Sequence, residues 1–385
     1  MTTAAELQEV DAVADNSCCS TAAVILTPDD LTPKMPNIPD APWIVERIKT
    51  SVGDVPRVPT ELTFADVLGS WKARWDINRM DYAVTPGLYC VGYPNSESPV
   101  LVTANYKMSF DRLRQELGGI NAWILVLDTK GINVWCAAGK GTFGTAEIIK
   151  RINAAYLHQV VSHRTIILPQ LGAPGVMGHE VKKQTGFKVV YGPVRAEDIP
   201  AFLAANMKAN PEMRRVKFGL IDRLVLTPIE LVSVIKPVLM ILGVLMLIQV
   251  TGLVNITWDT IYPYLGAVLL GTVATPALLP WIPGRAFAWK GWLTALIWAL
   301  VVCYWQGILP PKNGVLDLQL LLAAVGYVLV LPAISAYLAM NFTGASTYTS
   351  LSGVEKEMKY ALPLIIGSAG IGILATVISL ILNML

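Results

Sequence analysis

The sequence predicts an α/β domain built on a parallel sheet, followed by a domain of five transmembrane helices. Only 15% of the 385 residues are charged, whereas soluble domains carry roughly 25%. Just 11 of the 58 charged residues lie in the 157 residues from Ile229 onward. Before that point, short apolar runs alternate with helix-like stretches, which is typical of a parallel sheet covered by helices.

Residues 1–58 are expected to form a partly disordered arm. They contain several prolines and scattered acidic residues without sustained periodicity. The first 20 residues are acidic and polar, and they lack the basic and apolar regions of a secretory signal peptide. We therefore expect the domain that follows to be cytoplasmic.

The α/β domain is expected at 59–220. Its strands are predicted at 100–104, 123–127, 165–168 and 188–191, and its helices at 109–117, 145–157 and 196–207. In such domains, ligands bind beyond the carboxyl ends of the parallel strands. The loops 105–107, 128–144 and 169–175 should therefore lie on one rim of the sheet, where a binding site is expected.

Residues 221–236 are expected to form an interfacial linker, and 237–385 the transmembrane domain. Its five apolar stretches are each about long enough for the ~20 residues that a bilayer requires, and they lie near 237–254, 261–282, 291–309, 316–340 and 361–384. Lysines and arginines are concentrated before the first, between the second and third, and before the fifth stretch. The positive-inside rule then predicts an inner (cytoplasmic) membrane protein with the α/β domain in the cytoplasm and the C-terminus outside.

Several common site motifs are missing from the α/β domain. The stretch from Gly139 to Thr142 looks like a phosphate loop, but that motif requires glycine at Val134 and a hydroxyl residue at Gly141. Neither GxGxxG nor GxSxG is present. The three histidines lack the spacing of zinc ligands. No stripe of lysine and arginine indicates a nucleic-acid partner.

Cys136 is the strongest candidate for a chemical role. It lies in the glycine-rich segment 131–144, between an expected strand and an expected helix. The five cysteines form no CxxC pair, which favours a reducing compartment. The Cys136 side chain is either a small hydrophobic group in a packed turn or a thiolate, favoured by Lys140 and a helix start, that serves as nucleophile or soft-metal ligand.

The segment 133–140 reads Asn-Val-Trp-Cys-Ala-Ala-Gly-Lys. Here the sequence resembles the corrinoid-binding domain shared by the corrinoid iron-sulfur proteins of the acetyl-CoA pathway and the corrinoid protein of mercury methylation. The resemblance extends over 59–193 and includes Gly-Thr-Phe-Gly at 141–144 and Leu-Pro-Gln-Leu-Gly-Ala-Pro at 168–174. The five C-terminal helices match the mercury-methylation branch only. The acetyl-CoA branch carries an N-terminal four-cysteine cluster motif, whereas only Cys18 and Cys19 precede residue 90 here, so the resemblance implies no iron-sulfur cluster of its own.

The resemblance implies a cobamide, a vitamin B12-type corrinoid, bound in a Rossmann-like domain with Cys136 as the lower axial ligand of its cobalt. The nucleotide base of the cobamide would be displaced from the cobalt. The residues expected to contact the cofactor come from the cap segment and from the loops after two strands: Asn133, Val134, Trp135, Cys136, Ala137, Ala138, Gly139, Lys140, Gly141, Thr142, Thr103, Asn105, Gln170, Leu171, Gly172 and Ala173.

The activity implied by the resemblance is methyl transfer from methyl-Co(III) to Hg(II), which forms methylmercury. A thiolate opposite the methyl group would donate electron density to cobalt and favour transfer as a carbanion equivalent. The implied partners are a methyl donor of the methyltetrahydrofolate type and a ferredoxin-like [4Fe-4S] reductant. Cys18 and Cys19 either capture mercury or are incidental. Two alternatives stay open: a membrane-tethered corrinoid methyl carrier of one-carbon metabolism, and a cobamide-binding sensor or transport component.

Overall fold

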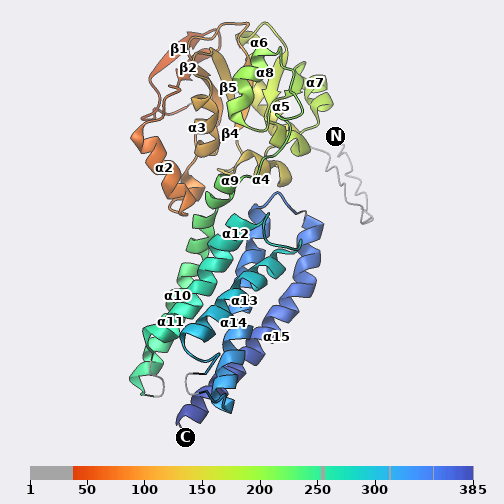
Figure 1. Ribbon diagram of the computed structural model, residues 1–385. Coiled ribbons are helices and arrows are strands. Elements are labelled where there is room, and N and C mark those ends of the chain that lie inside the picture. The colour runs from red at the N-terminus through yellow and green to blue at the C-terminus, as the bar shows by residue number, and fades with distance from the viewer. Residues whose placement is uncertain (1–37, 253–255, 312–313, 350, 385) are drawn as a thin grey trace, which may run out of the picture.

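The computed structural model describes residues 38–252, 256–311, 314–349 and 351–384. It has two parts stacked along one axis, an α/β domain formed by the first half of the chain and a bundle of long helices formed by the second (Figure 1). Cys18 and Cys19 lie outside the described residues, so their role stays a prediction.

One seven-stranded sheet forms the centre of the α/β domain. The spatial order is β1-β2-β3-β5-β4-β6-β7. The strands are β1 (Glu46–Thr50), β2 (Gly53–Arg57), β3 (Gly87–Val91), β4 (Val100–Ala104), β5 (Ala122–Leu127), β6 (Thr165–Leu168) and β7 (Lys188–Tyr191). Strands β5, β4, β6 and β7 run parallel to one another, with Leu101 opposite both Ile124 and Ile167. These four strands correspond to the four predicted ones.

The sheet is mixed, which corrects the prediction of a wholly parallel one. Strand β3 runs antiparallel to β5, with Gly87 opposite Val126, and β1 and β2 form an antiparallel hairpin that extends the sheet beyond β3. The hairpin lies in the segment expected to be a partly disordered arm. It is tied to the sheet because Val55 is fully buried in the core and the Cys90 thiol donates to the Pro56 carbonyl.

Helices cover both faces of the sheet. They are α2 (Phe64–Arg74), α3 (Lys107–Gln115), α4 (Val134–Gly139), α5 (Thr145–Ala154), α6 (Leu157–Val160), α7 (Gly178–Thr185) and α8 (Ile199–Ala204). The side chains of α3 and α8 pack with Leu101 and Ile124, whereas those of α5 and α7 pack with Val102 and Leu125. The two sets lie on opposite faces of the sheet because successive strand residues point to opposite faces. The predicted helix 145–157 is divided between α5 and α6 at Tyr156, whose φ is 46°.

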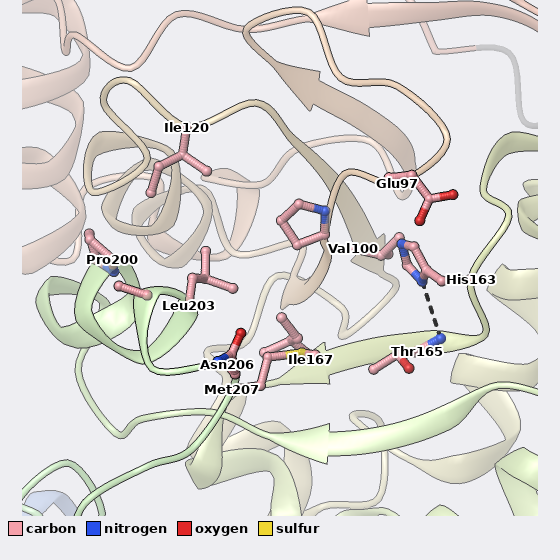
Figure 2. A pocket seen from close by; sticks show the side chains of 12 residues that line it. Glu97, Val100, Ile120, His163, Thr165, Ile167, Pro200, Leu203, Asn206 and Met207 are labelled. Carbon is pink, nitrogen blue, oxygen red and sulfur yellow. Dashed lines mark hydrogen bonds between the residues drawn. The ribbon is translucent and has the colours of Figure 1, made fainter.

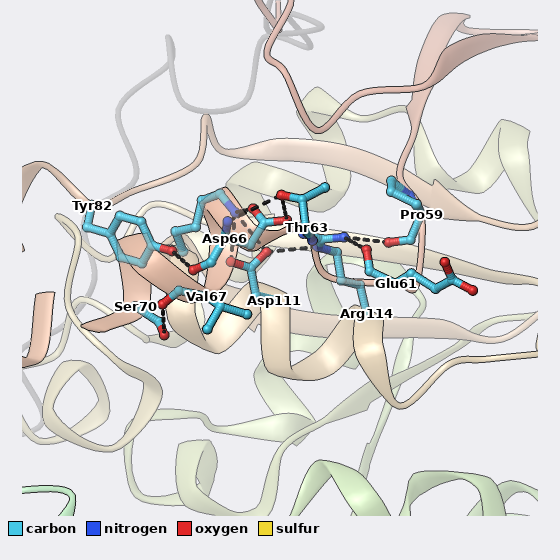
Figure 3. A network of polar contacts seen from close by, with 10 residues as sticks. Pro59, Glu61, Thr63, Asp66, Val67, Ser70, Tyr82, Asp111 and Arg114 are labelled. Atoms are coloured by element: carbon cyan, nitrogen blue, oxygen red, sulfur yellow. Dashed lines mark hydrogen bonds and ion pairs between the residues drawn. The ribbon is translucent and has the colours of Figure 1, made fainter. Parts of the chain in front are cut away.

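A buried network of four charged side chains joins α2 to α3 (Figure 3). Lys107 Nζ lies 2.7 Å from Asp66 Oδ1 and 2.7 Å from Asp111 Oδ2, and Arg114 lies 2.9 Å from Asp66 and 2.8 Å from Asp111. Burial alone would raise the pKa of the Asp66 carboxyl, but hydrogen bonds from Lys107 and from the Thr63 backbone hold that pKa well below its usual range. Two acids therefore balance two bases, and the network fixes α2 on the domain.

Helix α2 places Asp66, its residue in the buried network, towards the domain, and it exposes a stripe of apolar side chains to the surface. The stripe consists of Phe64, Val67, Leu68, Trp71 and Trp75, all exposed, at spacings that place them along one side of a helix. Phe64 is 81% and Trp71 64% exposed. This is the reverse of an ordinary surface helix. Its inner side is held by Asp66 and by a close contact of Gly69, where an added Cβ would lie 2.8 Å from the Tyr82 ring.

The second part of the chain has five helices long and apolar enough to cross a membrane within the residues that the structure describes. Four of these spans consist mainly of α10 (Thr227–Val250), α13 (Phe287–Trp305), α14 (Leu318–Asn341) and α15 (Leu351–Met384). The remaining span, Trp258–Leu278, consists of α11 (Trp258–Leu269), the π-helical turn η4 (Leu270–Ala274) and α12 (Thr275–Leu278). Small residues let α13 and α14 approach closely, since a Cβ added at Gly291 would lie 2.5 Å from the Ser335 carbonyl. Each of the five predicted stretches overlaps one of the five spans over most of its described residues, while residues 253 and 254 of the first stretch lie outside the described residues. Their orientation in a membrane stays a prediction.

A short helix, α9 (Leu220–Leu224), joins the two parts. Asp222 pairs with Arg195 of the α/β domain at 2.7 Å. The next residue, Arg223, is buried and donates to the carbonyls of Ala277, at 3.1 Å, and Phe218, at 2.6 Å. The predicted linker is therefore helical, because α9 and the start of α10 occupy most of it, and adjacent side chains of α9 attach to opposite parts of the protein.

Candidate functional site

The loops after β4, β5 and β6 leave the sheet at one edge. The chain passes from β4 to β5 on one side and then crosses to β6 on the other side of β4. Strands β4 and β6 therefore flank a topological switch point, where α/β proteins bind ligands. Helix α4, which carries Cys136, follows β5 and lies at the end of the α/β domain nearest the helical bundle (Figure 1).

Asn105 organises the loop that leads from β5 to α4. Its buried Oδ1 atom accepts hydrogen bonds from the Thr129 backbone N at 3.0 Å, the Thr129 hydroxyl at 2.8 Å and the Gly131 backbone N at 3.0 Å. Lys130 and Gly131 both have positive φ, at 60° and 70°. Two consecutive left-handed residues cost energy unless the surroundings impose them, so Asn105 holds the loop in the form that presents α4.

We expect Asn105→Ala to lower the free energy of unfolding by about 2 to 6 kcal/mol, because it leaves two backbone N–H groups buried without an acceptor, at ~1–3 kcal/mol each. Urea denaturation of the full chain in detergent, followed by circular dichroism, measures the change. Asn105→Asp is the matched control, since it keeps the acceptor oxygen. Equal stability of the alanine and wild-type proteins would show that the loop does not depend on this side chain.

Helix α4 has one buried and one open face. Asn133 caps its start, accepting a hydrogen bond from the Cys136 backbone N at 2.9 Å. Ala137 and Ala138 are buried against the domain, whereas Trp135, Gly139 and Lys140 are exposed, and Cys136 is half-buried. Cys136, Gly139 and Lys140 lie three and four residues apart and so share one face.

The inward face of α4 rests on the 3₁₀ turn Gln170–Gly175 after β6. A Cβ added at Gly175 would lie 3.1 Å from Ala138 Cα, and one added at Gly172 would lie 2.4 Å from the ring of buried Phe143. The predicted contacts Gly172 and Ala138 thus serve, in this structure, to pack the turn against α4. Any larger residue at these two glycines would push α4 away from the rim.

The other predicted contacts are distributed around this centre. Thr103 is buried on β4, and the Thr142 hydroxyl donates to the Ala137 carbonyl at 3.4 Å. Gln170 accepts a hydrogen bond from Arg214 at 2.7 Å. Leu171 packs against the core and Ala173 is half-buried in the same turn, while Gly141 is exposed. The structure therefore brings the cap segment, Asn105 and the 170–173 turn together, and their contacts with a cofactor stay predictions.

Cys136 differs from the other cysteines that the structure describes. Cys90 and Cys303 are buried, and burial raises the pKa of the Cys90 thiol to about 12, which keeps it protonated at neutral pH. Cys136 is half-buried, on the open side of α4. Among the described cysteines, it is thus the thiol best placed to reach a ligand.

A second cavity lies at the opposite edge of the sheet (Figure 2). It has a volume of about 550 Å³ and is lined by the first residues of β4 and β6, Val100 and Thr165, and by His163. Both ring nitrogens of His163 already have partners within the protein. Nδ1 accepts a hydrogen bond from the Thr165 backbone N at 3.3 Å, and Nε2 lies 2.9 Å from the Ser98 carbonyl oxygen. The amino ends of parallel strands are not the usual ligand edge, so this cavity is separate from the Cys136 rim.

The Cys136 rim fits a flat metal-bearing macrocycle better than a bare metal ion. The described residues contain no group of three or more His, Cys, Asp or Glu that could hold a metal. A single thiol is nevertheless sufficient as an axial ligand when a macrocycle supplies the equatorial ones. Beside Cys136, the open face of α4 is unobstructed at two positions, since a Cβ added at Gly139 or Gly141 would meet nothing within 4 Å.

The α/β domain that contains the Cys136 rim is similar in sequence to known proteins. Residues 76–203 match the family described as CO dehydrogenase/acetyl-CoA synthase delta subunit. The match lies within the α/β domain. It covers about a third of the chain, running from just before β3 to the end of α8, and stops before α9 and the helical bundle.

Subunit gamma of the acetyl-CoA decarbonylase/synthase complex provides the similar curated proteins. The subunit from Archaeoglobus fulgidus is 30% identical over 130 residues, which is 33% of this chain and 27% of that protein. The subunits from Methanopyrus kandleri and Methanocaldococcus jannaschii are both 34% identical, over 31% and 33% of this chain and 26% of each relative. The chain thus spans about a quarter of the length of the curated relatives it matches.

Three residues that shape the site were not identified from the sequence. Thr129 ties the loop to Asn105, Phe143 is fully buried between α4 and the 3₁₀ turn, and Gly175 allows that turn to approach Ala138. Phe143 had a visible signal, because a lone aromatic residue inside a glycine-rich loop indicates a core anchor. Thr129 had none, since its partner lies 24 residues earlier in the chain.

Proposed function

We propose that the α/β domain binds a cobamide and that the protein is a membrane-attached corrinoid methyl-transfer protein. The observation that carries this is the placement of Cys136, half-buried on the open face of α4 at the switch-point rim. The similarity of residues 76–203 to a subunit family of CO dehydrogenase/acetyl-CoA synthase supports it. When bound, the cobamide supplies the cobalt ion that carries the methyl group.

The residues of this chain have positioning roles. Asn133 fixes the first turn of α4 through the Cys136 backbone N, and burial of Val134 and Ala137 holds the helix on the domain, so that the thiol stays on the outward side. Gly139 leaves space for a flat ring beside the sulfur. As a thiolate, Cys136 would hold the cobalt from below and raise its electron density.

Two acceptors for the methyl group have support. The relatives are subunits of an acetyl-CoA decarbonylase/synthase complex, which favours a methyl carrier of one-carbon metabolism. Hg(II) is the other acceptor, because the five long apolar helices lie outside the family match and it is this helical half that resembles the mercury-methylation branch only. A methyl donor of the methyltetrahydrofolate type and a ferredoxin-like reductant belong to the proposal in either case.

A single-turnover experiment distinguishes the two acceptors. The full chain, loaded with methylcobamide without oxygen, is mixed either with Hg(II) as its thiol complex or with the same thiol alone. We expect methylmercury in the first mixture and none of the methyl group transferred in the second. Methylation of the thiol in both mixtures, without methylmercury, would favour the one-carbon carrier. No transfer in either mixture, from protein that holds a methylated corrinoid, would overturn Hg(II) as the acceptor and leave a one-carbon carrier whose acceptor is another protein.

A further inference from the structure

We propose that a groove between α13, α14 and α15 binds one anionic phospholipid. The groove has a volume of about 1090 Å³, at the upper end of the ~300–1,000 Å³ typical of ligand pockets. It opens along α15, where Tyr360 is 63% and Leu364 73% exposed. The proposal concerns the helical bundle and does not depend on the chemistry of Cys136.

The length of the groove fits a lipid in one leaflet. Its lining on α15 runs from Gly353 to Ser368, which at 1.5 Å per residue is about 22 Å of helix. One half of a bilayer, headgroups included, measures roughly 20–22 Å. The groove therefore reaches from the headgroup level towards the midplane.

The lining changes from polar to apolar along that length. Arg285, Thr347 and Lys356 lie at the end next to the α/β domain, whereas Ala333, Leu364 and Ile365 lie deeper in the bundle. Ser368, at the far end, is already satisfied, because its hydroxyl donates to the Leu329 carbonyl at 3.0 Å. This order matches a molecule with a polar head and an apolar tail.

The head end has positive charge available for a phosphate. Within the part of the chain that the structure describes, the side chains of Arg285 and Lys356 make no ion pair and no hydrogen bond. One carboxylate, that of Glu357, also lines the groove, and its Oε1 atom accepts a hydrogen bond from the Ala288 backbone N at 2.6 Å. Two cations with no partner thus face an opening at headgroup depth, where each contributes to anionic lipid binding.

The walls leave room for acyl chains. Trp289 and Trp292 stack on each other with ring centroids 5.2 Å apart, which gives a flat aromatic side at the depth where tryptophan is favoured in membranes. The opposite walls are made of small residues, including Ala333, Ala336 and Ala361. The hollow exists because these alanines face the aromatic pair.

The bound headgroup would touch the joint between the two parts of the protein. Tyr348 lines the groove, and its hydroxyl lies 3.4 Å from Arg223 Nη1 and donates to the Phe218 carbonyl at 3.3 Å. Arg223 and Phe218 belong to the connection that attaches α9 to the bundle. Occupancy of the groove would therefore stiffen the attachment of the α/β domain.

Native mass spectrometry of the full chain, released from micelles with phosphatidylglycerol or phosphatidylcholine, tests the proposal. We expect one phosphatidylglycerol to bind more tightly than phosphatidylcholine. Each cation near an anionic headgroup contributes about a fivefold effect, so Arg285→Gln with Lys356→Gln should weaken phosphatidylglycerol binding roughly thirtyfold. Lys359→Gln is the matched control, because Lys359 is an exposed cation of α15 that does not line the groove.

A steric variant and a competitor complete the test. Ala361→Trp fills the groove while leaving both cations in place, so it should weaken the binding of both lipids, and it remains informative if the double variant fails to fold. Inorganic phosphate should not displace the lipid. Equal affinity for the two lipids, wild-type affinity of the double variant, or displacement of phosphatidylglycerol by phosphate would each overturn the proposal.

Discussion

Replacing Cys136 with alanine is expected to lower the rate of methyl transfer by at least about 100-fold, since changes even to groups that support a metal ligand cost ~10–100-fold. The side chain lies on the open face of α4, away from the packed face that Ala137 and Ala138 form, so its removal should leave the fold intact. The measurement is single-turnover methyl transfer by cobamide-loaded protein, with the absorbance spectrum of the bound corrinoid recorded in parallel. A changed spectrum with retained corrinoid would show that the ligand, and not the binding site, was lost.

Two further variants separate ligation from folding. Cys136→His should retain the corrinoid but shift its spectrum, because imidazole replaces the thiolate as the axial group. Cys90→Ala is the matched control, since Cys90 is buried between strands and far from the open face of α4; it should lose some stability and keep its transfer rate. Transfer at the wild-type rate by the Cys136→Ala protein would disprove the role of the thiolate.

Replacing Asp66 with asparagine is expected to cost about 3–5 kcal/mol of unfolding free energy, the usual penalty for breaking a buried ion pair. Asp66 contacts both Lys107 and Arg114 in a network from which water is nearly excluded, so the substitution leaves an unbalanced positive charge. Asp40→Asn removes the partner of Arg47 from a pair in which Asp40 is 90% exposed, and it should cost at most about 1 kcal/mol. Equal losses of unfolding free energy in the two variants would contradict the view that the buried network stabilises the fold more than a surface ion pair does.

The same network predicts the direction of acid sensitivity. The pKa of Asp66 in the folded chain is lower than its ordinary value of 3.8, so the contribution of this carboxylate to stability is fully present above about pH 4 and is lost as the pH falls towards the folded pKa. Denaturation of the wild-type protein should therefore require less urea as the pH drops below about 4. Asp66→Asn should flatten that dependence, because the amide does not titrate.

Strands β4, β5 and β6 were predictable because they are almost wholly buried and read as continuous apolar runs, whereas β7 is only half-buried and was predictable from its apolar pair Val189 and Val190. The hairpin β1–β2 was not, since it is short and polar and contains Pro56, features that locally indicate a loop. Helix α4 spans only six residues, too few for a periodic pattern. In the site, Cys136 was recognisable from its segment, whereas the role of Asn105 depends on hydrogen bonds to residues 24 and 26 positions away, which local sequence does not encode.

The outward apolar stripe of α2 has a consequence for biosynthesis. The α/β domain leaves the ribosome first, and the 157 residues from Ile229 onward take about 8 to 30 s more at ~5–20 residues per second. During that interval Phe64 and Trp71 are exposed on a domain that can already have folded, while the five long apolar helices are still incomplete. The order of synthesis thus makes newly made α/β domains adhesive to one another, and early delivery of the ribosome to the membrane would shorten the time in which they can aggregate.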